Sequence, residues 1–159
     1  MAAILAPKPW IWTVIALAAL ALISAWIMQY GFGLYPCNLC IYQRYPYGLI
    51  VILCGLLAWR GWLAPALAAA LILLLIEAGV AYYHWGVELG LIPLPQACLG
   101  VDLADDFEAF KASILADKPR CDEVAFSLFG LSIAAMNALF ASLLAGLTGV
   151  VLRRQIQAN

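Results

Sequence analysis

The residues best suited to chemistry are Cys37 and Cys40, a Cys-x-x-Cys pair followed closely by Gln43 and Arg44. Such a pair has three common uses: thiol redox chemistry, half of a zinc site, or a plain structural bridge. A disulfide across so short a loop removes little chain entropy and so contributes little stability. Redox chemistry therefore explains the pair better than a structural bridge does.

The spacing to Gln43 and Arg44 suggests how one thiol is activated. If a helix begins near Cys40, Gln43 and Arg44 share a face with its sulfur. The thiolate is the reactive form, and both a helix N-terminus and a guanidinium lower a thiol pKa. We therefore expect Cys40 to be the activated thiol and Cys37 its exchange partner. The alternative for Arg44 is an ordinary charged side chain that extends from a membrane boundary to water.

The composition indicates an integral membrane protein. Hydrophobic residues make up 67% of the 159 residues and charged residues 11%, and the mean hydropathy is +0.99. Soluble domains are roughly half apolar. The net charge of −1 offers no basic surface for nucleic acid.

Four stretches are long enough to cross a bilayer, which takes about 20 apolar residues as a helix. We predict an all-α, four-transmembrane-helix bundle in a single domain, with spans at about 11–30, 41–59, 64–84 and 126–152. The loops at about 31–40 and 85–125 then lie on one side. The first run exceeds the roughly 7 to 15 apolar residues of a secretory signal and is expected to be a retained helix.

Lysine and arginine residues indicate the orientation. Four spans put both termini on one side, where Lys8, Arg60, Arg153 and Arg154 lie; the opposite side has Arg44, Lys111, Lys118 and Arg120. The totals are equal, but the positive-inside rule counts residues near span ends, and Lys111 lies deep in a loop. We therefore expect the termini to face the cytoplasm (N-in, C-in) and both loops to face outward.

The remaining cysteines divide into two kinds. Cys98 and Cys121 lie in the second outer loop, so they face the same compartment as Cys37 and Cys40, and an outer compartment is oxidising. They could form a structural bridge or exchange with the first pair. Cys54 lies in the middle of a span, where a buried thiol behaves as a small, inert apolar residue.

A metal centre is not predicted. Zinc would most naturally join the Cys-x-x-Cys pair to a second close pair, but Cys98 and Cys121 are 23 residues apart, and the single histidine, His84, has no His-x-x-x-His context. The sequence also lacks the haem, iron–sulfur and dinucleotide-binding patterns. A lipid-soluble electron acceptor remains, and a quinone fits the location.

Several segments resemble one family. PCNLCIYQR (36–44) resembles the Pro-Cys-x-x-Cys-x-x-Gln-Arg motif of the disulfide bond formation protein B (DsbB) family, membrane oxidases that recharge the periplasmic thiol oxidase DsbA. The similarity continues through YHWGVELG (83–90), Cys98 and RCDEVAFSLFGLSIAAMNAL (120–139). Many members have Met-Pro-x-Trp where this chain has residues 133–136, a departure that concerns the packing at the start of the fourth helix.

The resemblance implies a relay through both loops. A reduced partner attacks Cys98 of a Cys98–Cys121 disulfide, Cys121 exchanges with the first pair, and Cys40 delivers electrons to a quinone. The quinone would be ubiquinone or menaquinone, bound near Arg44, Gln43 and His84.

The same resemblance implies a multi-pass protein of the bacterial inner membrane, with its active loops in the periplasm and a DsbA-like thioredoxin-fold partner. The alternative is a non-enzymatic four-span scaffold whose outer loops are held by disulfides or zinc.

Two further features have weaker interpretations. A stripe of Leu103, Phe107, Phe110 and Ile114 predicts a short amphipathic helix that lies on the bilayer or a partner, or that merely fills the loop. Glu77 lies seven residues before His84, on the same helix face. An acid inside a span is costly, so Glu77 is a candidate proton path or the partner of a polar neighbour.

Overall fold

Four helical segments cross the structure from end to end. The computed structural model describes residues 6–98 and 119–158, so the stripe between residues 103 and 114 lies outside it. The segments long and apolar enough to cross a membrane are Pro7–Gly31, Asn38–Trp59, Leu63–Glu88 and Ile133–Ala158. The prediction of an all-α, four-span membrane protein is thereby confirmed.

The first two spans are built from several helical pieces. Helix α1 (Pro7–Trp26) starts with proline at its first position, where no N–H is needed, and continues into the π-helical turn η1 (Ile27–Gly31). The second span comprises α2 (Asn38–Tyr42), α3 (Arg44–Leu49), the π-helical η2 (Ile50–Cys54) and α4 (Gly55–Trp59). Pro46 cannot donate a hydrogen bond to the carbonyl of Tyr42, which accounts for the break between α2 and α3 at Gln43.

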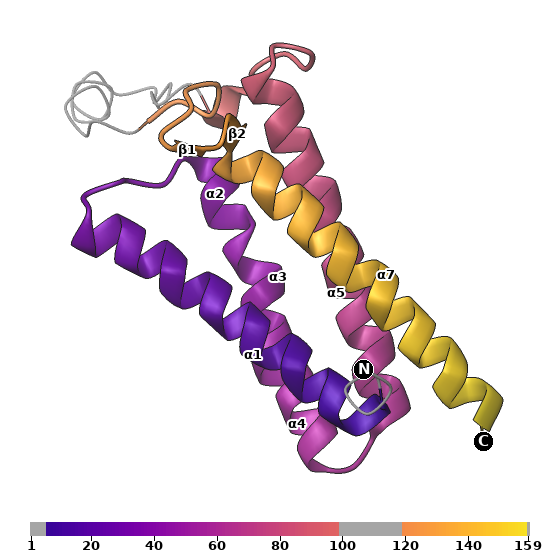
Figure 1. Cartoon of the computed structure of the whole chain (residues 1–159). Coiled ribbons are helices and arrows are strands. Elements are labelled where there is room, and N and C mark those ends of the chain that lie inside the picture. Colours follow the sequence, from indigo (N-terminus) through magenta and orange to yellow (C-terminus); the bar gives the residue numbers. More distant parts are fainter. Residues whose placement is uncertain (1–5, 99–118, 159) are drawn as a thin grey trace.

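Helices α5 (Leu63–Glu88) and α7 (Ile133–Ala158) lie side by side along most of their length (Figure 1). Their buried faces are rich in small residues, which let helix backbones approach closely in lipid. These residues are Ala66, Ala70, Ala78 and Ala81 on α5, and Ala134, Ala138, Ala141 and Ala145 on α7.

The start of the fourth span differs from the prediction. Residues 126–132 are not helical; they contain a hairpin of β1 (Ser127–Leu128) and β2 (Leu131–Ser132). Phe129 (φ 53°) and Gly130 (φ 80°) both have the positive φ that a tight two-residue hairpin turn requires. Helix α7 therefore begins at Ile133. The Ser132 hydroxyl accepts a hydrogen bond from the amide of Ala135 at 3.1 Å and caps its first turn.

The two ends of the bundle differ in character. The start of α1, the end of α7 and the α4–α5 turn lie at one end, while α2, the hairpin and the C-terminal end of α5 lie at the other (Figure 1). The cysteine-bearing segments, including the short 3-10 helix η3 (Gln96–Cys98), belong to the second end. The four cysteines predicted to share a compartment therefore share one end of the fold.

Candidate redox site

Cys37 is the N-terminal cap of α2. Its backbone is extended (φ −69°, ψ 170°), and its sulfur accepts a hydrogen bond from the amide of Cys40 at 3.3 Å. The first-turn amides of a helix have no partner within the helix, so an acceptor at the cap is stabilised there. A thiolate benefits most from this position because the helix N-terminus is positively polarised.

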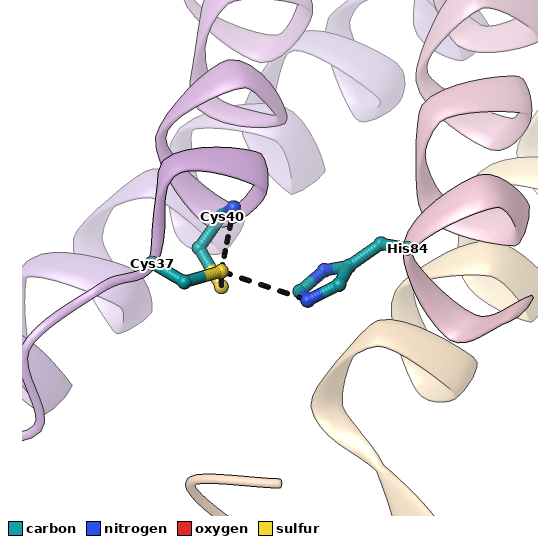
Figure 2. A group of neighbouring side chains, drawn as sticks. All are labelled: Cys37, Cys40 and His84. Carbon is teal, nitrogen blue, oxygen red and sulfur yellow. Dashed lines mark hydrogen bonds between the residues drawn. The ribbon is translucent and has the colours of Figure 1, made fainter. Parts of the chain in front are cut away.

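The two thiols of the Cys-x-x-Cys pair face the single histidine (Figure 2). Cys37 and Cys40 are free, with their sulfurs 3.0 Å apart. The Cys37 sulfur lies 3.5 Å from Nε2 of His84, which comes from α5. Both Cys37 and His84 are buried. An arrangement of two thiols and an imidazole supports proton exchange as well as electron exchange.

The stabilising contacts fall on Cys37, whereas the sequence interpretation assigned the activated thiol to Cys40. Hydrogen bonding with the Cys40 side chain is the main cause that lowers the pKa of Cys37; contact with His84 lowers this pKa further, and burial opposes both. The difference arises because the helix starts at Asn38 rather than near Cys40. The cap position and its amide donor therefore belong to Cys37.

The second cysteine pair is a disulfide in the structure. Cys98 and Cys121 are joined, with their Cα atoms 5.3 Å apart. Both pack in one buried cluster with Cys37, Leu39 and Val87. The His84 ring also donates a hydrogen bond to the main-chain carbonyl of Cys121. Residues from both cysteine-bearing connections thus contact one imidazole.

Arg44 and Gln43 line a cavity beside the thiol pair. The cavity has a volume of about 520 Å³ and is lined mainly by apolar side chains of the first, second and fourth spans. Cys40 lies on its wall, and Asn137 and Tyr47 provide further polar groups. Ligand sites of this size usually combine an apolar wall with a few polar groups that fix orientation.

The polar contact of Arg44 differs from the expected one. Its Nη1 donates to Oε1 of Gln29 at 2.6 Å. A guanidinium has five N–H groups, so this bond anchors Arg44 at the cavity wall while other donors remain for a ligand. The expected contact with the Cys40 thiol is replaced by an anchor on the first span.

The three predicted quinone-binding residues do not all touch the cavity in the same way. Gln43 and Arg44 line it, whereas His84 lies behind Gln43, with its Nδ1 3.4 Å from the Gln43 Nε2. His84 is therefore placed against Cys37 and contacts the cavity through the Gln43 amide. The residues fit a quinone, which needs an apolar slot and hydrogen-bond donors for its carbonyl oxygens.

A buried polar network extends from this point into the bundle. Asn137 Nδ2 donates to Oε1 of Gln43 at 3.2 Å and to Oε1 of Glu77 at 2.6 Å. The hydroxyl of Tyr47 donates to Oδ1 of Asn137 at 2.7 Å. Sequence reasoning identified Glu77 but missed Asn137 and Tyr47. An amide within the apolar fourth span was the signal that could have identified Asn137.

Glu88 is a further acid at the site that the sequence interpretation missed. Its Oε1 lies 3.9 Å from Nε2 of His84, and its Oε2 accepts a hydrogen bond from the Ser132 hydroxyl. Glu88 is four residues after His84 on α5, a spacing that places both on one helix face. That spacing was a usable signal.

The thiols and the imidazole are close enough to raise the question of a metal ion. The ligand atoms of Cys37, Cys40 and His84 lie within 4.8 Å of one another. The hydrogen bonds among them account for the same closeness, so the geometry does not by itself indicate a metal centre. Cys54, by contrast, is fully buried in the apolar core with Ile50 and Ala58, in the packing role expected of it.

A four-span membrane protein that gathers a free dithiol, a disulfide and a histidine at one end has the architecture of a membrane thiol–disulfide protein. Comparison with known proteins gives the family. Residues 7–151 match the family described as "Disulfide bond formation protein DsbB". The chain therefore belongs to the DsbB family of disulfide bond formation proteins, and it is a disulfide-generating oxidoreductase of the membrane.

Individual relatives agree. The chain is 30% identical over 156 residues to disulfide bond formation protein B of Haemophilus influenzae, covering 94% of this chain and 88% of the relative. It is 32% identical over 153 residues to the protein of that name from Verminephrobacter eiseniae, covering 90% and 85%, and 31% identical over 148 residues to that of Marinobacter nauticus, covering 85% and 86%. No solved structure gave a significant match.

Proposed function

We propose that the protein reoxidises a periplasmic DsbA-like dithiol protein and passes the two electrons to a membrane quinone. One observation carries the proposal: a free Cys37–Cys40 pair adjoins both the Cys98–Cys121 disulfide and a mainly apolar cavity lined by Arg44. The disulfide would be the entrance for electrons and the cavity the exit, both next to one dithiol.

The entrance is the second loop. A thiolate of the reduced partner attacks the Cys98 sulfur, breaks its bond to Cys121 and forms a mixed disulfide. The partner's second thiolate then attacks its own bonded sulfur and leaves oxidised, so Cys98 and Cys121 receive two electrons. Their reoxidation by a Cys37–Cys40 disulfide leaves the first pair reduced. The observed combination of a free first pair and a bonded second pair corresponds to the state after this exchange.

The exit is the cavity beside Cys40. A bound quinone supplies the acceptor for two electrons and two protons. Arg44, held by Gln29, would donate to a carbonyl oxygen in the cavity, and the apolar walls of the first and fourth spans would hold the ring and exclude water. His84 would donate a hydrogen bond from Nε2 to the Cys37 thiolate, and the Glu88 carboxylate, 3.9 Å from the same nitrogen, would favour the ring form that carries this proton.

The membrane setting follows from the same proposal. The cysteine end would face the periplasm of a bacterium and the termini the cytoplasm, across the inner membrane. The shared location of the termini with Arg60, Arg153 and Arg154 favours this orientation, because basic residues near span ends collect on the cytoplasmic side. The quinone could be ubiquinone or menaquinone, since both present the same pair of carbonyl oxygens.

The test is thiol-dependent quinone reduction by the purified protein. The purified protein is mixed with a reduced DsbA-type protein and a short-chain ubiquinone. The absorbance of the oxidised quinone should fall as the partner's thiols disappear. The same experiment is repeated with a menaquinone analogue. A scaffold held together by disulfides or zinc would leave both quinone and thiols unchanged.

A further inference from the structure

Glu77 lies at the far end of a chain of hydrogen bonds that leads to the redox pair. It is fully buried in the middle of α5, and its Oε1 accepts from Asn137 Nδ2 at 2.6 Å. Among the described residues, its Oε2 is a buried side-chain oxygen with no hydrogen-bond partner. Apolar burial of a carboxyl is costly, so its retention calls for a role.

Hydrogen bonds link Glu77, Asn137, Gln43 and His84 in series. The direction of each bond is determined by the one before it. A carboxyl oxygen without a proton can only accept, so Oε1 of Glu77 holds Nδ2 of Asn137 towards itself. The same nitrogen then donates to Oε1 of Gln43, while Oδ1 is left to accept from Tyr47. Gln43 must therefore direct its Nε2 towards Nδ1 of His84.

The last hydrogen bond of this series determines which ring nitrogen of His84 carries the proton. Because the Gln43 Nε2 is a donor, Nδ1 of His84 has to accept, and the ring proton of the neutral imidazole is located on Nε2. Nε2 is the atom that faces the Cys37 sulfur at 3.5 Å and the Glu88 carboxylate at 3.9 Å. The Cys121 carbonyl also accepts a hydrogen bond from this ring, and with the proton on Nε2 that donor is Nε2.

We propose that Glu77 is a positioning residue that, through Asn137 and Gln43, fixes His84 with its proton on Nε2 and so directs a hydrogen-bond donor at Cys37. The inference deepens the proposed function, on which its catalytic meaning rests, but the proton position itself is a separate property. It assigns Glu77 no proton transfer. The carboxyl acts as a hydrogen-bond acceptor that orders two amides bordering the cavity.

The decisive experiment reads the ring nitrogens of His84 directly. His84 is the only histidine in the chain, so protein labelled with nitrogen-15 histidine gives the NMR signals of one imidazole. The full-length protein in detergent should show a protonated Nε2 and an unprotonated Nδ1 when the ring is neutral. A neutral ring with its proton on Nδ1 would overturn the proposal.

Two substitutions show whether Glu77 acts as a hydrogen-bond acceptor or as an acid that transfers a proton. Glu77→Gln keeps an acceptor oxygen and should keep the wild-type spectrum and turnover. Glu77→Met keeps the volume but removes the acceptor; it should mix the two ring forms and lower turnover about tenfold, the effect of losing one hydrogen bond to a thiolate. A Glu77→Met spectrum identical to wild type contradicts the proposal. Loss of turnover in Glu77→Gln with an unchanged spectrum would make Glu77 an acid instead.

A second variant tests the proposal even if Glu77→Met misfolds, because it should reverse the direction of the hydrogen bonds between residue 137, Gln43 and His84. In the double variant Glu77→Gln with Asn137→Asp, the residue at position 137 can only accept, so Gln43 should turn its nitrogen towards it and its oxygen towards His84. The ring proton should then move to Nδ1; a proton that remains on Nε2 overturns the proposal.

The matched control is Thr148→Val, which removes another buried hydrogen bond of α7, from the Trp10 indole at 3.1 Å. It should leave the imidazole spectrum unchanged. An altered spectrum in this control would mean that any lost buried bond disturbs the ring, and would contradict a specific chain. If the wild type has the expected ring form but reduces no quinone, the proposed function fails while this inference stands.

Discussion

The Cys37 sulfur lies 3.5 Å from Nε2 of His84, although 47 residues separate the two in the sequence. The contact joins the N-terminal cap of the second span to the end of the third. It gives the first thiol of the pair two stabilising influences, a helix N-terminus and an imidazole, and both act on the same sulfur.

Cys37 should therefore react as a thiolate at unusually low pH. Hydrogen bonding with Cys40 and His84 lowers its pKa, and a lowered pKa keeps the thiolate populated as the pH falls below about 8.5, the value of an ordinary thiol. Alkylation by a small reagent, followed residue by residue with mass spectrometry, should continue near about pH 7 at Cys37. Cys54 lies in the middle of the second span within the apolar core, whereas Cys37 precedes that span; Cys54 is therefore the internal control and should stay unmodified.

Replacing the histidine should reverse part of this effect. In His84→Leu the thiolate loses one hydrogen bond to a charged group, roughly 1.5 to 3 kcal/mol, or about one to two pKa units. The alkylation profile of Cys37 should move to higher pH by that amount. A profile that does not move would mean that the helix cap and Cys40 alone stabilise the thiolate.

Serine substitution should divide the five cysteines into two groups. Serine at Cys37, Cys40, Cys98 or Cys121 should abolish quinone-dependent oxidation of a dithiol protein, because each sulfur takes part in the relay. Cys54→Ser should retain it, since Cys54 packs in the core. Steady-state oxidation of the partner's thiols is the measurement. Full turnover by Cys98→Ser would contradict a relay through both loops.

The spans could be predicted from sequence because long apolar runs between charges have few alternatives at membrane length. The start of the fourth span could not. Residues 126–132 are as apolar as a helix, and hydropathy does not reveal that Phe129 and Gly130 adopt positive φ and turn the chain into a hairpin.

The chemistry of the pair was predictable in kind but not in detail. Cys-x-x-Cys and its arginine pointed to thiol exchange, yet the choice of activated thiol depended on where the helix starts, a boundary that shifts by a few residues. The roles of Asn137 and Tyr47 arise from contacts between spans that no sequence spacing specifies, whereas the spacing of Glu88 from His84 was a usable signal. His84 was found from resemblance, but its position against Cys37 needed the fold.

Arg44 should matter for the acceptor rather than for thiol exchange. Removing a donor to a quinone oxygen costs roughly 1.5 to 3 kcal/mol, which corresponds to about a ten- to hundredfold rise in the apparent quinone KM of Arg44→Ala. Arg44→Lys should recover part of this, because the ammonium keeps the charge but loses the planar fork.

The measurement is the quinone-concentration dependence of partner oxidation, with Arg60→Ala, at the other end of the second span, as the control. An unchanged KM and turnover in Arg44→Ala would return Arg44 to an ordinary residue at the membrane boundary.

Purified protein should contain no stoichiometric zinc. Cys37, Cys40 and His84 lie close together, but their mutual hydrogen bonds and the neighbouring cavity suit electron transfer. Elemental analysis of protein isolated without chelators measures the zinc content per chain. Treatment with a chelator should leave turnover unchanged. One zinc per chain, lost together with the fold on chelation, would favour the scaffold.

The central claim is that the Cys37–Cys40 dithiol passes its electrons directly to a quinone, and a single-turnover experiment tests it most directly. Protein with a reduced first pair and an intact Cys98–Cys121 disulfide is mixed with one equivalent of short-chain ubiquinone, without any partner protein. We predict that one quinone is reduced for each Cys37–Cys40 disulfide formed, seen as loss of quinone absorbance and of two titratable thiols. A first pair that stays reduced while bound quinone stays oxidised would contradict the account.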